Sequence, residues 1–140
     1  MKQNRGKYKA TVRNIQKDTR PKAHAKFVRV SDLKARVLLE QIKNKDVNTA
    51  MAILTYSPRG AAVIVKDVLK SAIANAAENH HLDAEELYVE EAIANQGPTM
   101  KRIRPKAKGK AYPILKRSSH ISIYLNEKSK KQQKQQKKKS

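Results

Sequence analysis

Positive side chains alternate with small or apolar ones in one segment late in the chain. The cations stand at even positions: Arg102, Arg104, Lys106, Lys108 and Lys110. The residues between them are Ile103, Pro105, Ala107, Gly109 and Ala111. In an extended chain, residues two apart project from the same face, so the cations would form one row with a spacing suited to phosphates. A planar guanidinium can also grip a phosphate at two points or stack on a base, so the pattern predicts RNA binding.

The alternative is that this segment is only a solvated basic loop, as charge runs often are. The length of the segment and its regular alternation favour RNA binding instead. Further candidates lie near the N-terminus: Lys22, His24, Lys26, Arg29, Lys34 and Arg36. Phosphate binding and plain solubility explain these six equally well.

Catalytic and metal-binding patterns are missing from the sequence. The histidines, His24, His80, His81 and His120, form no HExxH pair and do not stand at ligand spacing with carboxylates. There is no cysteine, and the 4 glycines form no Walker, GxSxG or Rossmann pattern. We therefore expect no enzyme, no metal site and no cofactor.

The distribution of charge separates a globular centre from two basic ends. The chain of 140 residues has a formal charge of +20, with 32 basic and 12 acidic side chains. Residues 1–30 hold 10 basic and 1 acidic residues, residues 101–140 hold 15 and 1, and residues 31–100 hold the remaining 7 and 10. Such an excess of charge needs a polyanion to neutralise it, and a nucleic acid is the obvious one.

The composition indicates neither export nor membrane binding. The N-terminus lacks the apolar segment of a signal peptide, and neither basic end carries bulky apolar residues opposite its lysines. We expect a cytoplasmic protein without membrane contacts and without a homo-oligomer.

Helical spacing dominates the first part of the central region. A short strand is predicted over 26–30, followed by a helix that Ser31 or Asp32 caps, with Leu33, Val37, Leu38 and Ile42 on its buried side. A short helix is predicted over about 47–54. A third helix should begin with Ser57 as N-cap and Pro58 as first residue, and end near residue 79.

Extended structure is predicted for the second part. A strand that starts at 87–89 should pair with the alternating strand 120–125. Residues from about 91 to 116 then form a long hairpin, which at about 12 residues an arm and ~3.3 Å per residue projects on the order of 40 Å. The fold class is α+β: about three helices packed on a short antiparallel sheet, a basic arm over 1–21, a domain over 22–125 and a Lys/Gln-rich tail over 126–140.

Three motifs in and around the hairpin carry a family resemblance: GPTMKR at 97–102, PKAKGK at 105–110 and KRSSHI at 116–121. Further matches are VRVS at 28–31, ILTY at 53–56 and LKSAIANA at 69–76. Over about residues 22–125, the sequence closely resembles the family of large-subunit ribosomal protein twenty-two, in its bacterial rather than its archaeal or eukaryotic form. Residues before about 22 and after about 126 fall outside the resemblance.

The resemblance implies a structural protein of the large ribosomal subunit, with its compact domain on the exterior and its hairpin along the nascent polypeptide exit tunnel. The implied partners are several domains of the large ribosomal RNA, neighbouring ribosomal proteins and, transiently, the nascent chain. The hairpin tip is expected around Met100, Lys101, Arg102 and Arg104. Besides the cations named above, the expected RNA contacts include Lys101, Lys116, Arg117 and His120.

Two other functions remain to be weighed against this one. An architectural DNA-binding protein would need a dimer interface or a base-reading helix, and the sequence shows neither. An RNA-processing enzyme would need a convergent acid, base or metal site, which is also missing. Equal affinity for duplex DNA and ribosomal RNA would support the first, and turnover of RNA abolished by a point mutation would support the second.

Overall fold

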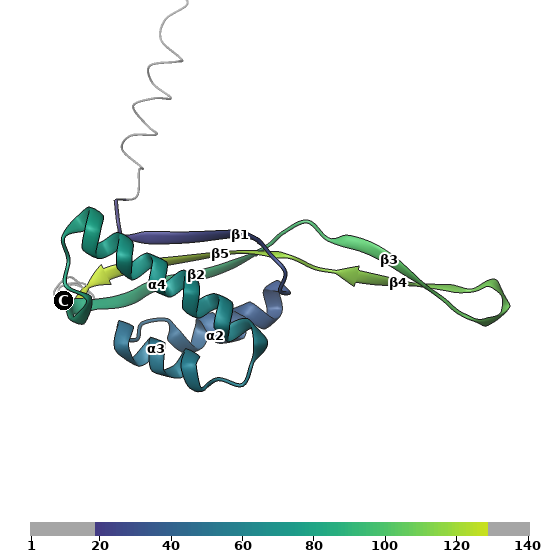
Figure 1. Ribbon diagram of the computed structural model, residues 1–140, viewed down its shortest axis with the longest axis horizontal. Coiled ribbons are helices and arrows are strands. Elements are labelled where there is room, and N and C mark those ends of the chain that lie inside the picture. Colours follow the sequence, from purple (N-terminus) through teal and green to yellow (C-terminus); the bar gives the residue numbers. More distant parts are fainter. Residues whose placement is uncertain (1–18, 129–140) are drawn as a thin grey trace, which may run out of the picture.

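The computed structural model describes residues 19–128, in which a long two-stranded ribbon projects to one side of a small α+β domain (Figure 1). The elements of the domain are β1 (Lys22–Val28), α2 (Asp32–Ile42), α3 (Val47–Tyr56), α4 (Gly60–His80), β2 (Leu87–Gln96) and β5 (Ser119–Glu127). The ribbon consists of β3 (Met100–Pro105) and β4 (Ala111–Lys116). The predicted α+β class with three helices, a short antiparallel sheet and a long hairpin is confirmed. The predicted arm before residue 19 and tail after residue 128 lie outside the described residues.

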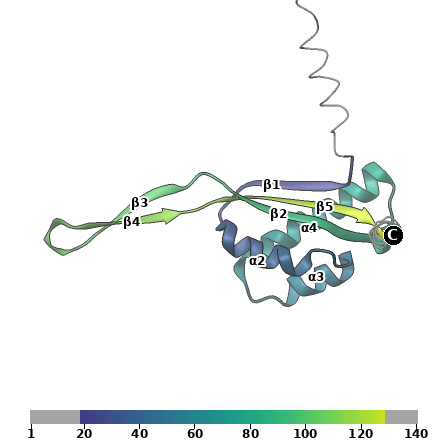
Figure 2. The same cartoon turned by 180° about the vertical axis from the view of Figure 1, so that it is seen from behind.

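The sheet of the domain has three antiparallel strands in the order β1-β5-β2, so the last strand of the chain lies in the centre. The helices cover one face of this sheet, and no other element among residues 19–128 covers the opposite face (Figures 1 and 2). The predicted pairing of the strand at 87–89 with 120–125 is confirmed by the partners Val89 and Leu125.

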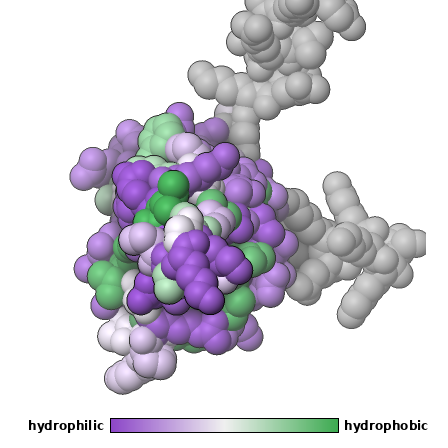
Figure 3. Space-filling model, turned by 90° about the vertical axis from the view of Figure 1, so that its right-hand side faces the viewer, coloured by the Kyte–Doolittle hydropathy of each residue, from purple (hydrophilic) through white to green (hydrophobic). Residues whose placement is uncertain are grey.

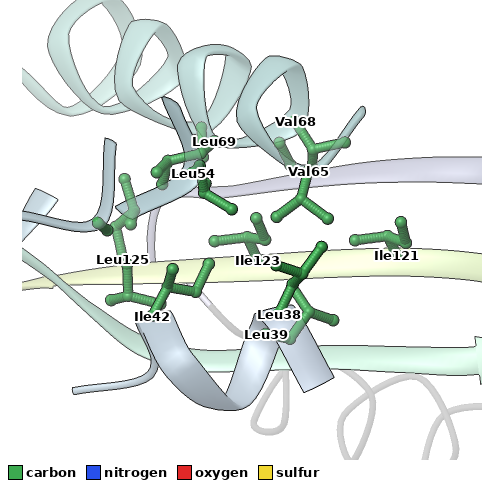
Figure 4. Close-up of a cluster of buried hydrophobic side chains, with 14 of the residues drawn as sticks. Leu38, Leu39, Ile42, Leu54, Val65, Val68, Leu69, Ile121, Ile123 and Leu125 are labelled. Carbon is green, nitrogen blue, oxygen red and sulfur yellow. The ribbon is translucent and has the colours of Figure 1, made fainter. Parts of the chain in front are cut away.

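The core lies between β5 and the helices, where Ile121, Ile123 and Leu125 point from the central strand toward α2 and α4 (Figure 4). These three residues are two apart and fully buried, which is the period of a strand with one covered face. Ser122 and Tyr124, which lie between them and point to the other face, are partly exposed. Alternation along β5 therefore decides which face binds the helices.

The buried side of the first helix was predicted correctly only in part. Its buried residues are Ala35, Leu38, Leu39 and Ile42, spaced as one helical face, whereas Leu33 is 65% exposed. Val37, also predicted to be buried, is exposed. Leu38 and Ile42 were correctly placed inside. The prediction failed because two apolar stripes share this helix, and only contact with the sheet decides between them.

The other two helices lie close to their predicted positions. The helix predicted over about 47–54 runs to Tyr56, with Ala50 and Leu54 buried. The third helix begins at Gly60 after Arg59 as N-cap, two residues later than predicted, because Ser57 ends α3 and Pro58 lies in the connection. Four of its alanines, Ala61, Ala62, Ala72 and Ala76, are buried and let the helix pack closely.

Two strands are longer than predicted. β1 begins at Lys22 rather than at residue 26, because pairing with β5 holds even a sequence with few apolar residues at the sheet edge. β2 continues to Gln96, where it pairs with Ser119, so residues 91–96 belong to the domain sheet and not to the projecting hairpin. The projecting part therefore starts at Gly97, and an arm of about 10 residues at ~3.3 Å each reaches on the order of 30 Å.

Candidate nucleic-acid interface

The ribbon has two faces of different chemistry. Its register pairs Arg102 with Ile114 and Arg104 with Tyr112, and paired residues of an antiparallel ladder project to the same side. The other side carries Ile103 opposite Pro113, and Lys101 opposite Leu115. The predicted separation of Arg102 and Arg104 from Ile103 and Pro105 is therefore confirmed for β3. One face presents guanidinium groups, and the other is mainly apolar.

The row of five cations does not continue along one strand, because the chain reverses inside it. The Lys106 N–H donates to the Lys110 carbonyl oxygen at 2.7 Å, and the turn passes through left-handed backbone at Lys108 (φ 57) and Gly109 (φ 69). Lys108 thus stands at the end of the ribbon. The three turn lysines surround this end instead of extending the arginine face.

The tip of the hairpin lies further along the chain than the sequence predicted. Met100, Lys101, Arg102 and Arg104 lie on the first arm, and Met100 pairs with Lys116 at the end nearer the domain. The turn lies at residues 106–110 because Pro105 and Ala111 are the last paired residues. The second half of the GPTMKR motif thus lies in the first arm, and the PKAKGK motif forms the turn after Pro105.

A tight neck joins the ribbon to the domain. The Gly97 N–H donates to the Ser118 carbonyl oxygen at 2.9 Å, and the Ser118 hydroxyl donates to the Pro98 carbonyl oxygen at 2.6 Å. A Cβ on residue 97 would stand 2.7 Å from Ser118 Oγ, so only glycine fits without a shift. Arg29 reaches this neck from the loop after β1, with Nη1 3.6 Å from Met100 Sδ.

A basic groove lies on the domain between the starts of α2 and α4. It has a volume of about 740 Å³, and its charged lining residues are Arg29, Lys34 and Arg59. No carboxylate lines it, and the exposed Leu33 and Val37 give it an apolar wall. Two helix N-termini, with their positive dipole ends, border it. Arg29 and Lys34 were predicted RNA contacts. Arg59 was missed, because the sequence predicted a helix start at Pro58 and only the structure places Arg59 directly before the helix.

Several predicted cations already have partners within the protein. Arg36 binds the Ala94 carbonyl oxygen and Asp32, and His24 Nδ1 lies 2.8 Å from Ser122 Oγ. His120 accepts a hydrogen bond from the Phe27 N–H. Lys22 lies over the Tyr124 ring, with Nζ 6.0 Å from its centroid. Lys26, Lys116 and Arg117, by contrast, are exposed. The structure brings the predicted contacts together as a ribbon and a neighbouring domain surface, and their contact with RNA stays a prediction.

Arg20 is an anchor that the sequence left in the unstructured arm. Its guanidinium lies 2.9 Å from Glu90 Oε2 and 3.4 Å from Glu91 Oε2, and it covers the Tyr124 ring at 4.8 Å. The neighbouring Pro21 carbonyl oxygen accepts from the Leu125 N–H at 2.9 Å. The adjacent Glu90 and Glu91 on β2 were the available signal, because two neighbouring carboxylates repel each other unless a cation lies close to both.

Metal-binding clusters and membrane-spanning helices are absent from the described part of the chain. Among residues 19–128, no three histidine or acidic side chains come close enough to hold a metal ion. Within the same range, no helix has the length and apolar character needed to cross a membrane. Seen from the side on which the ribbon projects, the surface is largely hydrophilic with separate apolar patches (Figure 3).

The fold and the interface define a small α+β protein whose three-stranded sheet is backed by helices and extended by a cationic two-stranded ribbon. The family model described as Ribosomal protein L22p/L17e matches residues 23–126, and the chain belongs to this family. The predicted family is thus confirmed, and with it the prediction of a ribosomal protein rather than an enzyme.

Similar proteins share most of the chain. One from Lachnoclostridium phytofermentans is 54% identical over 115 residues, which cover 82% of this chain and 90% of that protein. One from Clostridium acetobutylicum is 54% identical over 106 residues, covering 76% and 96%. One from Lacticaseibacillus casei is 52% identical over 106 residues, covering 76% and 91%. All three are described as large ribosomal subunit protein uL22, and they are bacterial, in agreement with the predicted bacterial form.

Proposed function

We propose that this protein is a structural component of the large ribosomal subunit in the cytoplasm, where it binds ribosomal RNA and joins separate RNA segments. Its similar proteins are named for that subunit. Its partners are the large ribosomal RNA and neighbouring ribosomal proteins. The ribbon lines the path of the nascent chain.

The observation that carries this proposal is the ribbon itself. Residues 97–118 contain eight basic side chains and no acidic one. Both arms are exposed along nearly their whole length, and β3 and β4 pair only with each other. An isolated two-stranded ribbon is marginal in water, and its like charges repel. A polyanion that lies along it supplies both the missing contacts and the missing counter-charge.

Binding at several separate places explains how one small protein can hold RNA segments together. The arginine face of β3, the lysines of the turn and the basic groove around Lys34 are distinct positive surfaces. Each phosphate that replaces condensed counterions adds a salt-dependent contribution to affinity. Contacts on both the domain and the distant turn fix two RNA segments relative to each other.

The uncharged face of the ribbon supports the exit-tunnel part of the proposal. Ile103 and Leu115 are exposed there, and Lys101 is the one cation on that side of the described pairs. If the arginine face lies on RNA, this side faces away from it. A surface with few charges would not hold the charged segments of a passing chain by electrostatic attraction.

RNA binding is tested by titrating the full chain with large-subunit ribosomal RNA at increasing salt. For the double variant R102A/R104A, we expect the slope of log affinity against log salt to fall by about two, one for each lost phosphate contact. The matched control is K43A/K70A, which removes two exposed cations away from the ribbon and groove. Equal slopes for both variants, or equal affinity for duplex DNA, would reject the proposed surface.

The tunnel position is tested by crosslinking, since the chain contains no cysteine. Ribosomes carrying A107C, at the ribbon turn, are loaded with a stalled nascent chain that contains one cysteine. We expect a disulfide to form there and not with the control A74C on the exposed side of α4. No crosslink from residue 107 at any nascent-chain length would remove the tunnel from the proposal.

A further inference from the structure

The one phenylalanine of the chain is turned away from the core. Phe27 is 62% exposed, near the end of the edge strand β1. In a regular strand, residues two apart share a face, so Phe27 should follow Ala23 and Ala25 toward the helices. The pairing of β1 with β5 instead shifts between Ala25 and Val28, and it is Val28 that packs on the core. A bulge thus places a smaller residue inside and the aromatic ring outside.

This arrangement requires unfavourable backbone. Phe27 has a φ of 58°, a left-handed conformation that is rare for bulky residues and costs on the order of 1 kcal/mol, whereas asparagine and glycine adopt it readily. Because Phe27 is mostly exposed, its burial contributes little to the stability of the free domain. Such local strain typically accompanies a functional contact.

The ring is held in a defined orientation. The Phe27 N–H donates to His120 Nδ1 at 3.0 Å, and the two rings meet edge to face with centroids 4.8 Å apart and planes at 86°. Because Nδ1 accepts this bond, the neutral imidazole carries its proton on Nε2. The aromatic surface is therefore preorganised on the central and edge strands.

The ring borders a hollow of positive or neutral polar chemistry. The hollow has a volume of about 480 Å³ and is lined by His24, Lys26, Phe27, His120 and Ser122, together with two apolar residues. No acidic side chain lines it. His120 and Ser122 alternate along β5 with the buried Ile121 and Ile123, so the hollow opens on the face of the sheet opposite the helices. A flat aromatic surface beside a lysine and two imidazoles suits a nucleotide, whose base stacks while its phosphate meets the cation.

We propose that Phe27 is a stacking platform for an unpaired base of the bound RNA, with Lys26 beside it on the phosphate. The inference rests on the proposed RNA binding and adds a contact that is not electrostatic. It accounts for the bulge, the strain and the exposure together. A protein partner on this ring is the competing outcome, which the test below separates.

The first test uses F27N, which removes the ring and relieves the backbone. The full-length variant is titrated with large-subunit ribosomal RNA, and its thermal unfolding is measured without RNA. We expect affinity to fall about 10-fold, as for the loss of one stacked base, with an unchanged salt slope and a free protein at least as stable as wild type. Wild-type affinity of F27N, or a clear loss of stability, would overturn the inference. If F27N binds normally while R102A/R104A loses affinity, only the stacking is refuted. If the wild-type protein itself fails to bind RNA, the proposed RNA-binding function is refuted as well.

The second test exploits the absence of tryptophan from the chain. F27W keeps an aromatic surface and should retain RNA affinity, and its fluorescence should be quenched when RNA binds, because a base stacks on the indole. Y56W places the control indole at the exposed end of α3. Equal quenching at both positions, or none at residue 27 under saturating RNA, would contradict stacking.

Discussion

Arg36 of α2 reaches across to β2, where its Nε donates to the Ala94 carbonyl oxygen at 3.2 Å. The same guanidinium lies 3.3 Å from Asp32, four residues earlier on the helix. Ala94 itself is buried close to the point where β2 leaves the domain. Arg36 therefore connects the first helix to the base of the ribbon, which is a structural role for a residue first predicted to bind RNA.

Substituting Arg36 should affect folding more than RNA binding. R36A removes a hydrogen bond from a charged donor, so we expect the free energy of unfolding to fall by about 1 kcal/mol, with little added by the half-exposed ion pair. The salt slope of RNA binding should stay at the wild-type value. Denaturant unfolding and the RNA titration measure the two quantities. A stable R36A with a reduced slope would show that Arg36 binds phosphate after all.

The neck of the ribbon should reject any side chain at residue 97. G97A brings a Cβ to 2.7 Å from Ser118 Oγ, which must move and lose its bond to Pro98. We expect a loss of about 1–2 kcal/mol and faster hydrogen exchange of the residue 97 amide. G60A is the control, because nothing lies within 4 Å of its new Cβ and alanine favours a helix. It should leave stability equal or raise it, and a loss as large as that of G97A would disprove the neck argument.

The two apolar stripes of α2 should differ sharply in energy. L38A empties a fully buried position and should cost roughly 2–5 kcal/mol. L33A removes a side chain that is mostly exposed, so we expect a change within about 0.5 kcal/mol. Thermal or denaturant unfolding of both variants provides the comparison. Comparable losses would mean that Leu33 is buried as well as Leu38, as the sequence predicted.

Some elements of the fold follow from local sequence periodicity, and others depend on contacts between distant segments. Strong periodicity was sufficient for the helix from Gly60 to His80 and for the strand that contains Ile121 and Ile123. The face of α2 was not predictable, because Leu33 and Leu38 are equally apolar and only the tertiary contact distinguishes them. The start of the edge strand β1 at Lys22 was not predicted, because residues 22–25 are held in the strand by pairing with β5, about 100 residues away in the sequence.

For the candidate interface, too, local periodicity predicted some features, and those that depend on tertiary contacts were missed. Alternation correctly separated Arg102 from Ile103, because the period of a strand is local. It could not reveal that Lys108 stands in a turn, where the left-handed backbone ends the alternation. The groove at Arg59 and the outward bulge at Phe27 depend on elements that meet only in the folded domain.

The turn lysine gives a prediction that separates charge from conformation. Lys108 has left-handed backbone, with a φ of 57°. K108N removes its charge and introduces a residue type that tolerates this conformation. We expect the salt slope of RNA binding to fall by about one and the stability of the free domain to be unchanged. The control G109N keeps every charge and should not change the slope. An unchanged slope for K108N would deny Lys108 its phosphate contact.

The central claim, an integral and RNA-bound ribosomal protein, is tested most directly by sedimentation. The tagged full-length chain is expressed in a bacterium, and the lysate is separated on a gradient at high salt, where purely electrostatic adsorption weakens steeply. We predict that the chain stays with the large subunit. Complete release into the top fractions, while other ribosomal proteins remain on the particle, would contradict the account.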